Sequence, residues 1–263
     1  MNKYVNLLRK HLAMQFSYFF SHKQATLFSF FADFFEFFMQ PLILYFIYEI
    51  SSGFSGWNID EMFFLIATSR ISLSIAGSTV IGIVFAQGWK LDSGNFHEVL
   101  LKPFNVILYM IITSINTGWL MDITVGIILL IYSIIKLNIA VTLAGVLSYI
   151  YMILISLLCY YGIAGLIMNF LFKNPRAENI MDLFWTTTNF SRYPLNIFPN
   201  AMKFILTFIF PIALSSYYPA AYFLNKINDY SAMIIFSLIG IAFAFVGTIA
   251  LKNGLKNHIS YGG

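Results

Sequence analysis

The sequence has very few charged residues. Asp, Glu, Lys and Arg together make up only 10% of its 263 residues, whereas a soluble domain carries roughly 25%. A water-exposed surface cannot be built from so few charges, which excludes a soluble globular protein. Hydrophobic residues make up 59% of the chain instead. A helix crosses a bilayer with about 20 mostly apolar residues, so the chain has room for roughly six spans.

Cysteine is almost absent, and catalytic patterns are lacking. Cys159 is the only cysteine and lies within an apolar run, so neither a disulfide framework nor a thiolate metal site can form within one chain. The stretch 82–90 has neither the glycine spacing nor the Gly-Lys pair of a phosphate-binding loop. The histidines lack the i, i+4 spacing that would place two on one metal ion: His11, His22, His97 and His258. We therefore expect no catalytic residue, metal or cofactor in this chain.

The N-terminal segment does not have the continuous apolar core of a cleaved signal peptide. Three basic residues are spread through the stretch that would have to form this core: Lys3, Arg9 and Lys10. Between Tyr4 and Phe20, apolar residues recur at three- and four-residue spacing, with polar residues opposite them. This pattern predicts a helix within residues 1–23 that lies in the membrane interface.

Long apolar segments fill most of the remaining chain and predict transmembrane helices. The clearest are Ala25–Glu49, Met62–Gln87, Val106–Ile135, Ile139–Phe172 and Tyr230–Leu251. Most connections between them are short and polar. The exception is the charged loop of residues 88–105, which follows the second span.

The segment 176–224 allows two interpretations. In the first, Glu178–Arg192 crosses the membrane, and residues 193–224 form two short helices that enter the outer leaflet and turn back, broken at Pro211. In the second, Ala201–Leu224 is the crossing, kinked at Pro211, and the preceding segment stays cytoplasmic. Irregular backbone at membrane depth is tolerated only against protein or a wet cavity. Both interpretations give an all-α protein with six crossings and both termini on one side.

Basic residues indicate which side that is. A cytoplasmic N-terminus leaves only four basic residues outside on the first interpretation: Lys136, Arg192, Lys203 and Lys226. The same orientation places the larger group inside: Lys3, Arg9, Lys10, Lys23, Lys90, Lys102, Lys173, Arg176, Lys252 and Lys256. Because Lys and Arg are enriched in cytoplasmic loops, both termini are predicted to be cytoplasmic.

Two ionisable residues fall within predicted spans: Arg70 in the second and Asp122 in the third. An unpaired charge in hydrocarbon is costly, so such residues usually face a partner or a wet path. We hypothesise that Arg70 and Asp122 lie at similar depth and pair. The pair would either hold two helices together or line a substrate path.

The loop between Gly88 and Pro103 predicts a short amphipathic helix that projects into the cytoplasm. Asn95 and Glu98 have the spacing of a helix-capping box, and Pro103 marks the exit. Phe96, Val99 and Leu100 are expected to make one apolar face. The helix either lies on lipid headgroups or docks a cytoplasmic partner, and the polar His97 and Glu98 favour docking.

These features together resemble the membrane subunits of type-2 ABC exporters. The order of elements is the same, including a cytoplasmic helix within Gly94–Pro103 and a broken external hairpin before the last span. The hairpin cues are Phe184-Trp185, Tyr193-Pro194, Phe198-Pro199, Phe210-Pro211 and Tyr218-Pro219-Ala220. The resemblance covers nearly the whole chain and points to a subgroup of bacterial ABC permeases with mostly undefined substrates. It favours the first interpretation of residues 176–224, with a re-entrant hairpin at 193–224.

Family membership implies a single permease domain, residues 1–263, in the bacterial cytoplasmic membrane. The permease would pair with itself or a related permease, and two separate ATPase subunits would bind ATP and Mg²⁺ and dock on the loop. The implied coupling residues are Gly94, Phe96, His97, Glu98, Leu100, Leu101 and Pro103. Apolar walls would suit lipids, drugs or peptide-like amphipathic cargo. The alternatives from other classes are a standalone channel or secondary transporter, and a membrane enzyme.

Overall fold

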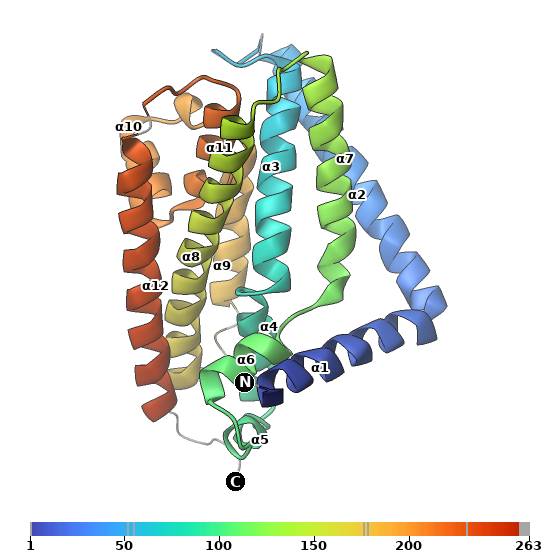
Figure 1. The fold of residues 1–263 in the computed structure, drawn as a ribbon, viewed down its shortest axis with the longest axis vertical. Helices are drawn as coiled ribbons and strands as arrows, with labels where there is room; N and C mark the ends of the chain where they lie inside the picture. Colours follow the sequence, from blue (N-terminus) through green and yellow to red (C-terminus); the bar gives the residue numbers. More distant parts are fainter. Residues whose placement is uncertain are drawn as a thin grey trace.

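The computed structural model describes residues 2–51, 53–54, 56–175, 177, 179–229 and 231–257. Arg176, Glu178, Tyr230 and His258 lie outside the described residues. Within the described part, the regular elements are all helices, which confirms the predicted all-α class. Four long helices run side by side in Figure 1: α3 (Ile59–Ser78), α7 (Leu120–Lys136), α8 (Leu143–Lys173) and α12 (Ala232–Lys256).

The closest helix packing is between α8 and α12. A Cβ atom at Gly165 on α8 would lie 2.3 Å from the carbonyl oxygen of Gly247 on α12. Only glycine permits such an approach, because any side chain would collide with the neighbouring backbone. The two helices therefore form the most tightly joined part of the bundle.

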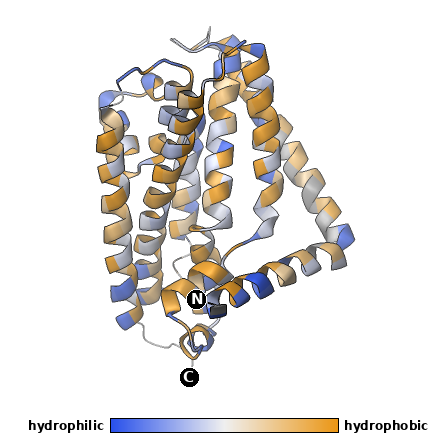
Figure 2. Cartoon of the chain, viewed as in Figure 1, coloured by the Kyte–Doolittle hydropathy of each residue, from blue (hydrophilic) through white to orange (hydrophobic). Residues whose placement is uncertain are grey.

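Helix length and composition support several crossings. Three helices of the described chain are long and apolar enough to span a bilayer: Thr117–Lys136, Leu143–Lys173 and Ala232–Lys256. The pair α3 and α4 (Gly82–Asp92) is a fourth if its 43° bend lies within one span. Figure 2 shows hydrophobic residues along most of α7 and α12. The remaining two of the six predicted crossings stay a prediction.

The third predicted span is not one continuous helix, so the expectation for Val106–Ile135 is wrong in this respect. The helix α6 (Val106–Thr113) ends, the short turn η1 (Thr117–Trp119) follows, and α7 then begins. At the break, the Asn116 side chain accepts a hydrogen bond from the Gly118 N–H. Asn is a preferred N-cap residue because its side chain satisfies an amide that the helix leaves free.

The N-terminal helix α1 (Asn2–Ser21) crosses the end of the bundle at a steep angle to the other helices in Figure 1. The following helix α2 (Lys23–Ile50) then runs obliquely back toward the opposite end. Apolar side chains on α1 are exposed, among them Val5 and Phe16 at 59% and 46%. This is the arrangement expected of a helix whose apolar face meets lipid.

The segment that allowed two interpretations is divided into short pieces. The helix α9 (Asn179–Thr188) runs along the bundle and ends in η2 (Asn189–Arg192). Further short elements follow at the opposite end from α1: η3 (Leu195–Ile197), α10 (Asn200–Phe204), η4 (Ile205–Ile209), η5 (Ile212–Ser215) and α11 (Tyr217–Phe223). No piece reaches span length, so the structure does not form the continuous kinked helix of the second interpretation. Which segment makes the fifth crossing stays a prediction.

Candidate functional site

The structure brings Arg70 and Asp122 together. The Arg70 Nη1 donates to Asp122 Oδ1 between α3 and α7, and the side chains are only 9% and 21% exposed. The break before α7 places Asp122 in the first turn of that helix, where the helix dipole favours a carboxylate. A Cβ at Gly126, one turn later, would lie 2.7 Å from the Ile71 side chain, so α3 and α7 approach closely around the pair.

The loop predicted to be cytoplasmic, residues 88–105, contains a helix stop at Gly94. The helix α4 ends at Asp92, and Gly94 has a φ of +74°. Its N–H donates to the Leu91 carbonyl at 3.2 Å. A left-handed residue after a helix is usually glycine, because a Cβ is strained there. Gly94 therefore ends α4 and turns the chain into the loop.

The predicted helix of the loop is shorter than expected. It is a single turn, α5 (His97–Leu100), and its N-cap Phe96 makes no side-chain capping bond. The predicted capping box between Asn95 and Glu98 is wrong, because the Glu98 N–H donates to the backbone carbonyl of Asn95 at 3.2 Å and not to its side chain. The motif with that geometry occurs at the start of α3, between Asn58 and Glu61.

Two residues of α5 and its flank anchor the loop to the bundle. Phe96 and Val99 are each 1% exposed. The Phe96 ring packs edge-on against Phe172 near the end of α8, with centroids 5.1 Å apart. The predicted apolar face is wrong at Leu100, which is 44% exposed, because one helical turn buries only one side of the loop.

The opposite side of the loop is exposed and mixes apolar and charged groups. We name it the exposed loop surface, and it consists of Trp89, His97, Glu98, Leu100 and Leu101. Leu101 is 79% exposed and Trp89 is 73% exposed. Trp89 was not among the predicted coupling residues, although a tryptophan directly after an apolar span could have indicated it. Large exposed apolar side chains beside charges are typical of protein interaction sites.

The end of the loop is attached to α1. Lys3 Nζ donates to the Pro103 carbonyl at 3.3 Å, and the Asn105 N–H donates to Tyr4 Oη at 3.2 Å. The Tyr4 and Phe104 rings also lie 5.6 Å apart. Sequence reasoning missed these contacts because their partners are about a hundred positions apart.

The predicted hairpin residues lie in the short elements opposite α1. Pro194, Pro199 and Pro211 stand at breaks between these elements, whereas Pro219 is buried within α11. The Tyr193 ring packs edge-on against Phe54, with centroids 6.4 Å apart.

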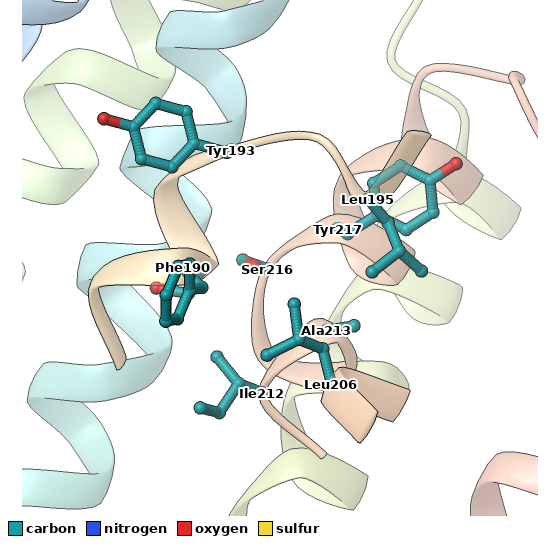
Figure 3. A pocket seen from close by; sticks show the side chains of 9 residues that line it. Phe190, Tyr193, Leu195, Leu206, Ile212, Ala213, Ser216 and Tyr217 are labelled. Carbon is teal, nitrogen blue, oxygen red and sulfur yellow. The ribbon is translucent and has the colours of Figure 1, made fainter. Parts of the chain in front are cut away.

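A small cavity lies among these elements, lined by Phe190, Ser191, Tyr193, Leu195, Leu206, Ile212, Ala213, Ser216 and Tyr217 (Figure 3). Its volume is about 10 Å³, which is about the space that one water molecule needs. The buried Ser216 Oγ has no hydrogen-bond partner in the protein, so it could bind such a water. The cavity is too small for a transported molecule.

Within the described residues, no cluster of three or more His, Cys, Asp or Glu side chains could hold a metal ion. Cys159 is 1% exposed and packs in the core beside Leu214 and Phe236. Its burial fits the predicted role as a small hydrophobic residue.

The fold defines a multi-pass helical membrane protein. Residues 16–262 match the family described as ABC-2 family transporter protein. Because the match covers nearly the whole chain, the chain belongs to this family, and the resemblance to type-2 ABC permease subunits is confirmed. The family is a membrane transport component, and membership implies partnership with an ABC ATPase. No curated protein and no solved structure matches the chain.

Proposed function

We propose that this permease couples transport to ATP hydrolysis through the exposed loop surface, on which separate ATPase subunits dock. The observation that carries the proposal is the division of the loop into two sides. Phe96 and Val99 fix one side to the bundle, while Glu98 and Leu101 are exposed on the other. A partner pressing on such a loop moves the helices to which it is anchored.

The force has two routes into the membrane helices. The first is the packing of Phe96 on Phe172, which leads into α8. The second is covalent, since the loop continues into α4 and α6 and through them to α3 and α7. The Arg70–Asp122 pair joins α3 to α7. We propose that its role is to keep these two helices moving together rather than to line a substrate path.

The partner subunits would bind ATP and Mg²⁺, and the permease itself would need no cofactor. Two ATPase subunits and two permeases, identical or related, would form the transporter in a bacterial cytoplasmic membrane. The orientation is supported by the basic residues on α1, on the loop and near the end of α12, which lie toward the same end of the molecule. That end is assigned to the cytoplasm because Lys and Arg are enriched there.

The proposed activity is export of a lipid, drug or peptide-like amphipathic molecule. Membership of the ABC-2 family favours this ATP-driven transport over the alternatives of a channel, a secondary transporter or a membrane enzyme.

Co-purification tests the docking site. Glu98→Arg and Leu101→Asp should each reduce the ATPase recovered with the permease by about tenfold or more, since truncating a central interface contact costs about 2 kcal/mol. Glu49→Arg is the matched control, because Glu49 is also exposed but lies in the last turn of α2, at the opposite end of the molecule. An unchanged complex with both loop variants would refute the docking site.

A further inference from the structure

Two interrupted helix pairs meet at one place in the structure. The break between α3 and α4 lies at residues 79–81, and the break between α6 and α7 begins at residue 114. The Asn116 N–H donates to the Ser78 carbonyl at 3.1 Å. A Cβ at Gly82 would lie 2.5 Å from the Ser114 carbonyl oxygen. The two backbones therefore touch, and we call this contact the joint.

Aromatic packing also connects both sides of the joint. Trp185 of α9 stacks on Phe85 of α4 and on Trp119 of η1, with centroids 5.6 and 5.8 Å apart. Aromatic rings pack in several offset or tilted arrangements, whereas a hydrogen bond has a preferred direction. The joint therefore combines stacked rings with a few contacts of fixed direction.

One of the fixed contacts comes from α1. His11 is 8% exposed, and its Nε2 lies 2.8 Å from the Ile115 carbonyl oxygen. A carbonyl can only accept a hydrogen bond, so Nε2 carries the proton. Ile115 lies between α6 and η1, where a carbonyl needs a partner from outside the helix. His11 supplies that partner across 104 positions of sequence.

The contacts of α1 therefore reach both ends of α6. Lys3 and Tyr4 bind the chain just before α6, at Pro103 and Asn105. His11 binds the chain just after α6, at Ile115. A helix attached to another at both ends cannot rotate independently of it without breaking those contacts.

We propose that His11 is a positioning residue that pins α1 to the joint, so that α1, α6 and the cytoplasmic loop turn as one body when the ATPase subunits close. The turning motion rests on the proposed coupling function. The pinning of α1 by His11 can be tested separately.

Spin-label distances test both parts in the ATPase complex reconstituted into lipid nanodiscs. A Cys159→Ala background removes the only native thiol. Arg9→Cys with Asp92→Cys reports α1 against α4, and Asp92→Cys with Lys136→Cys reports α4 against the far end of α7. All three positions are exposed, and none of them belongs to the exposed loop surface.

The expected result has four parts. ATP trapping shifts the Asp92–Lys136 distance but leaves the Arg9–Asp92 distance unchanged. His11→Ala broadens the Arg9–Asp92 distribution and reduces the ATP-dependent shift. His11→Gln restores both, because its amide N–H can reach the same carbonyl. His22→Ala, which removes an exposed imidazole just after the end of α1, is the control and changes neither.

An unchanged Arg9–Asp92 distribution in His11→Ala would overturn the pinning. If that variant does not fold, the two distances in the wild-type chain provide the test. An ATP-dependent shift of the Arg9–Asp92 distance as large as that of the Asp92–Lys136 distance would show that α1 does not move together with the loop, and would overturn the proposal. Failure of the coupling function has a different signature. In that case no ATPase is recovered or ATP shifts neither distance, while the comparison of His11→Ala with His11→Gln still decides the pinning.

Discussion

The carboxylate of Asp122 and the guanidinium of Arg70 are in direct contact, although 52 positions separate them in the sequence. Removing one partner takes this ion pair away from a mostly buried charge, and breaking a buried pair typically costs about 3 to 5 kcal/mol. Arg70→Ala should therefore clearly lower the thermal unfolding temperature of the detergent-solubilised protein. The exchange Arg70→Asp with Asp122→Arg should recover much of the loss. If the exchanged protein folds normally but no longer transports, the pair lines a substrate path instead.

Close packing between α8 and α12 predicts a strong effect at Gly165. Gly165→Ala would place a methyl group against the Gly247 backbone, and overpacking of this kind typically costs about 1 to 3 kcal/mol. The free energy of unfolding is the measurement. Gly88→Ala is the control, because a Cβ there meets only the Leu171 side chain at an ordinary 3.5 Å. Equal stability of the two variants would contradict the packing argument.

The positive φ of Gly94 predicts that alanine is poorly tolerated there. Gly94→Ala should cost about 1 kcal/mol of stability, because a Cβ is strained at φ +74°. It should also lower the recovery of ATPase, since the direction of the loop depends on this turn. Gly94→Asn should behave better, because Asn tolerates the left-handed conformation. Equal losses with Ala and Asn would rule out backbone strain as the cause.

Lys226 links the hairpin end to the loop between α2 and α3. Its Nζ lies 2.8 Å from Glu61 Oε1 and 2.6 Å from the Gly56 carbonyl oxygen. It also lies 4.8 Å from the centre of the Trp57 ring. Lys226→Met should destabilise the protein by about 1 kcal/mol, a sum of partly screened ion-pair and cation–π contributions. The loss should shrink in high salt, and a loss independent of salt would point to packing instead.

Labelling of Asn200→Cys in the Cys159→Ala background tests the topology of the hairpin. Asn200 is exposed at the start of α10, so a membrane-impermeant thiol reagent should modify it from outside the cell. Lys102→Cys on the loop proposed to be cytoplasmic is the control and should react only after the membrane is opened. Labelling of Asn200→Cys only from inside would overturn the external hairpin.

Much of the fold could be predicted because the bilayer imposes simple requirements. Runs of apolar residues long enough to cross it can satisfy their backbone only as helices, so α8 and α12 followed directly from composition. The break at Asn116 could not be predicted in the same way. Its flanks are apolar, and the carbonyl of Ser78 that accepts the Asn116 N–H comes from a distant part of the chain.

The candidate site, like the fold, could be predicted from the sequence only in part. Glu98 and Leu101 were identified from a short motif, whereas Trp89 and the anchoring role of Phe96 appeared only when burial was known. The predicted capping box failed because the Glu98 N–H has another acceptor within reach, the backbone carbonyl of Asn95. A local pattern shows what a side chain can do but not which of its available partners it binds.

The sequence by itself determined that this chain is a helical membrane protein, because hydropathy and charge are properties of composition and order, and the order of its motifs supplied the resemblance to ABC permeases. It also indicated that Arg70 and Asp122 need partners, since lone charges in hydrocarbon are costly. Only the tertiary structure decided that α1 holds both ends of α6 through Lys3, Tyr4 and His11. Such contacts depend on where distant segments come to lie, and the close approach of helix breaks and carbonyls is set by the packing of the whole bundle.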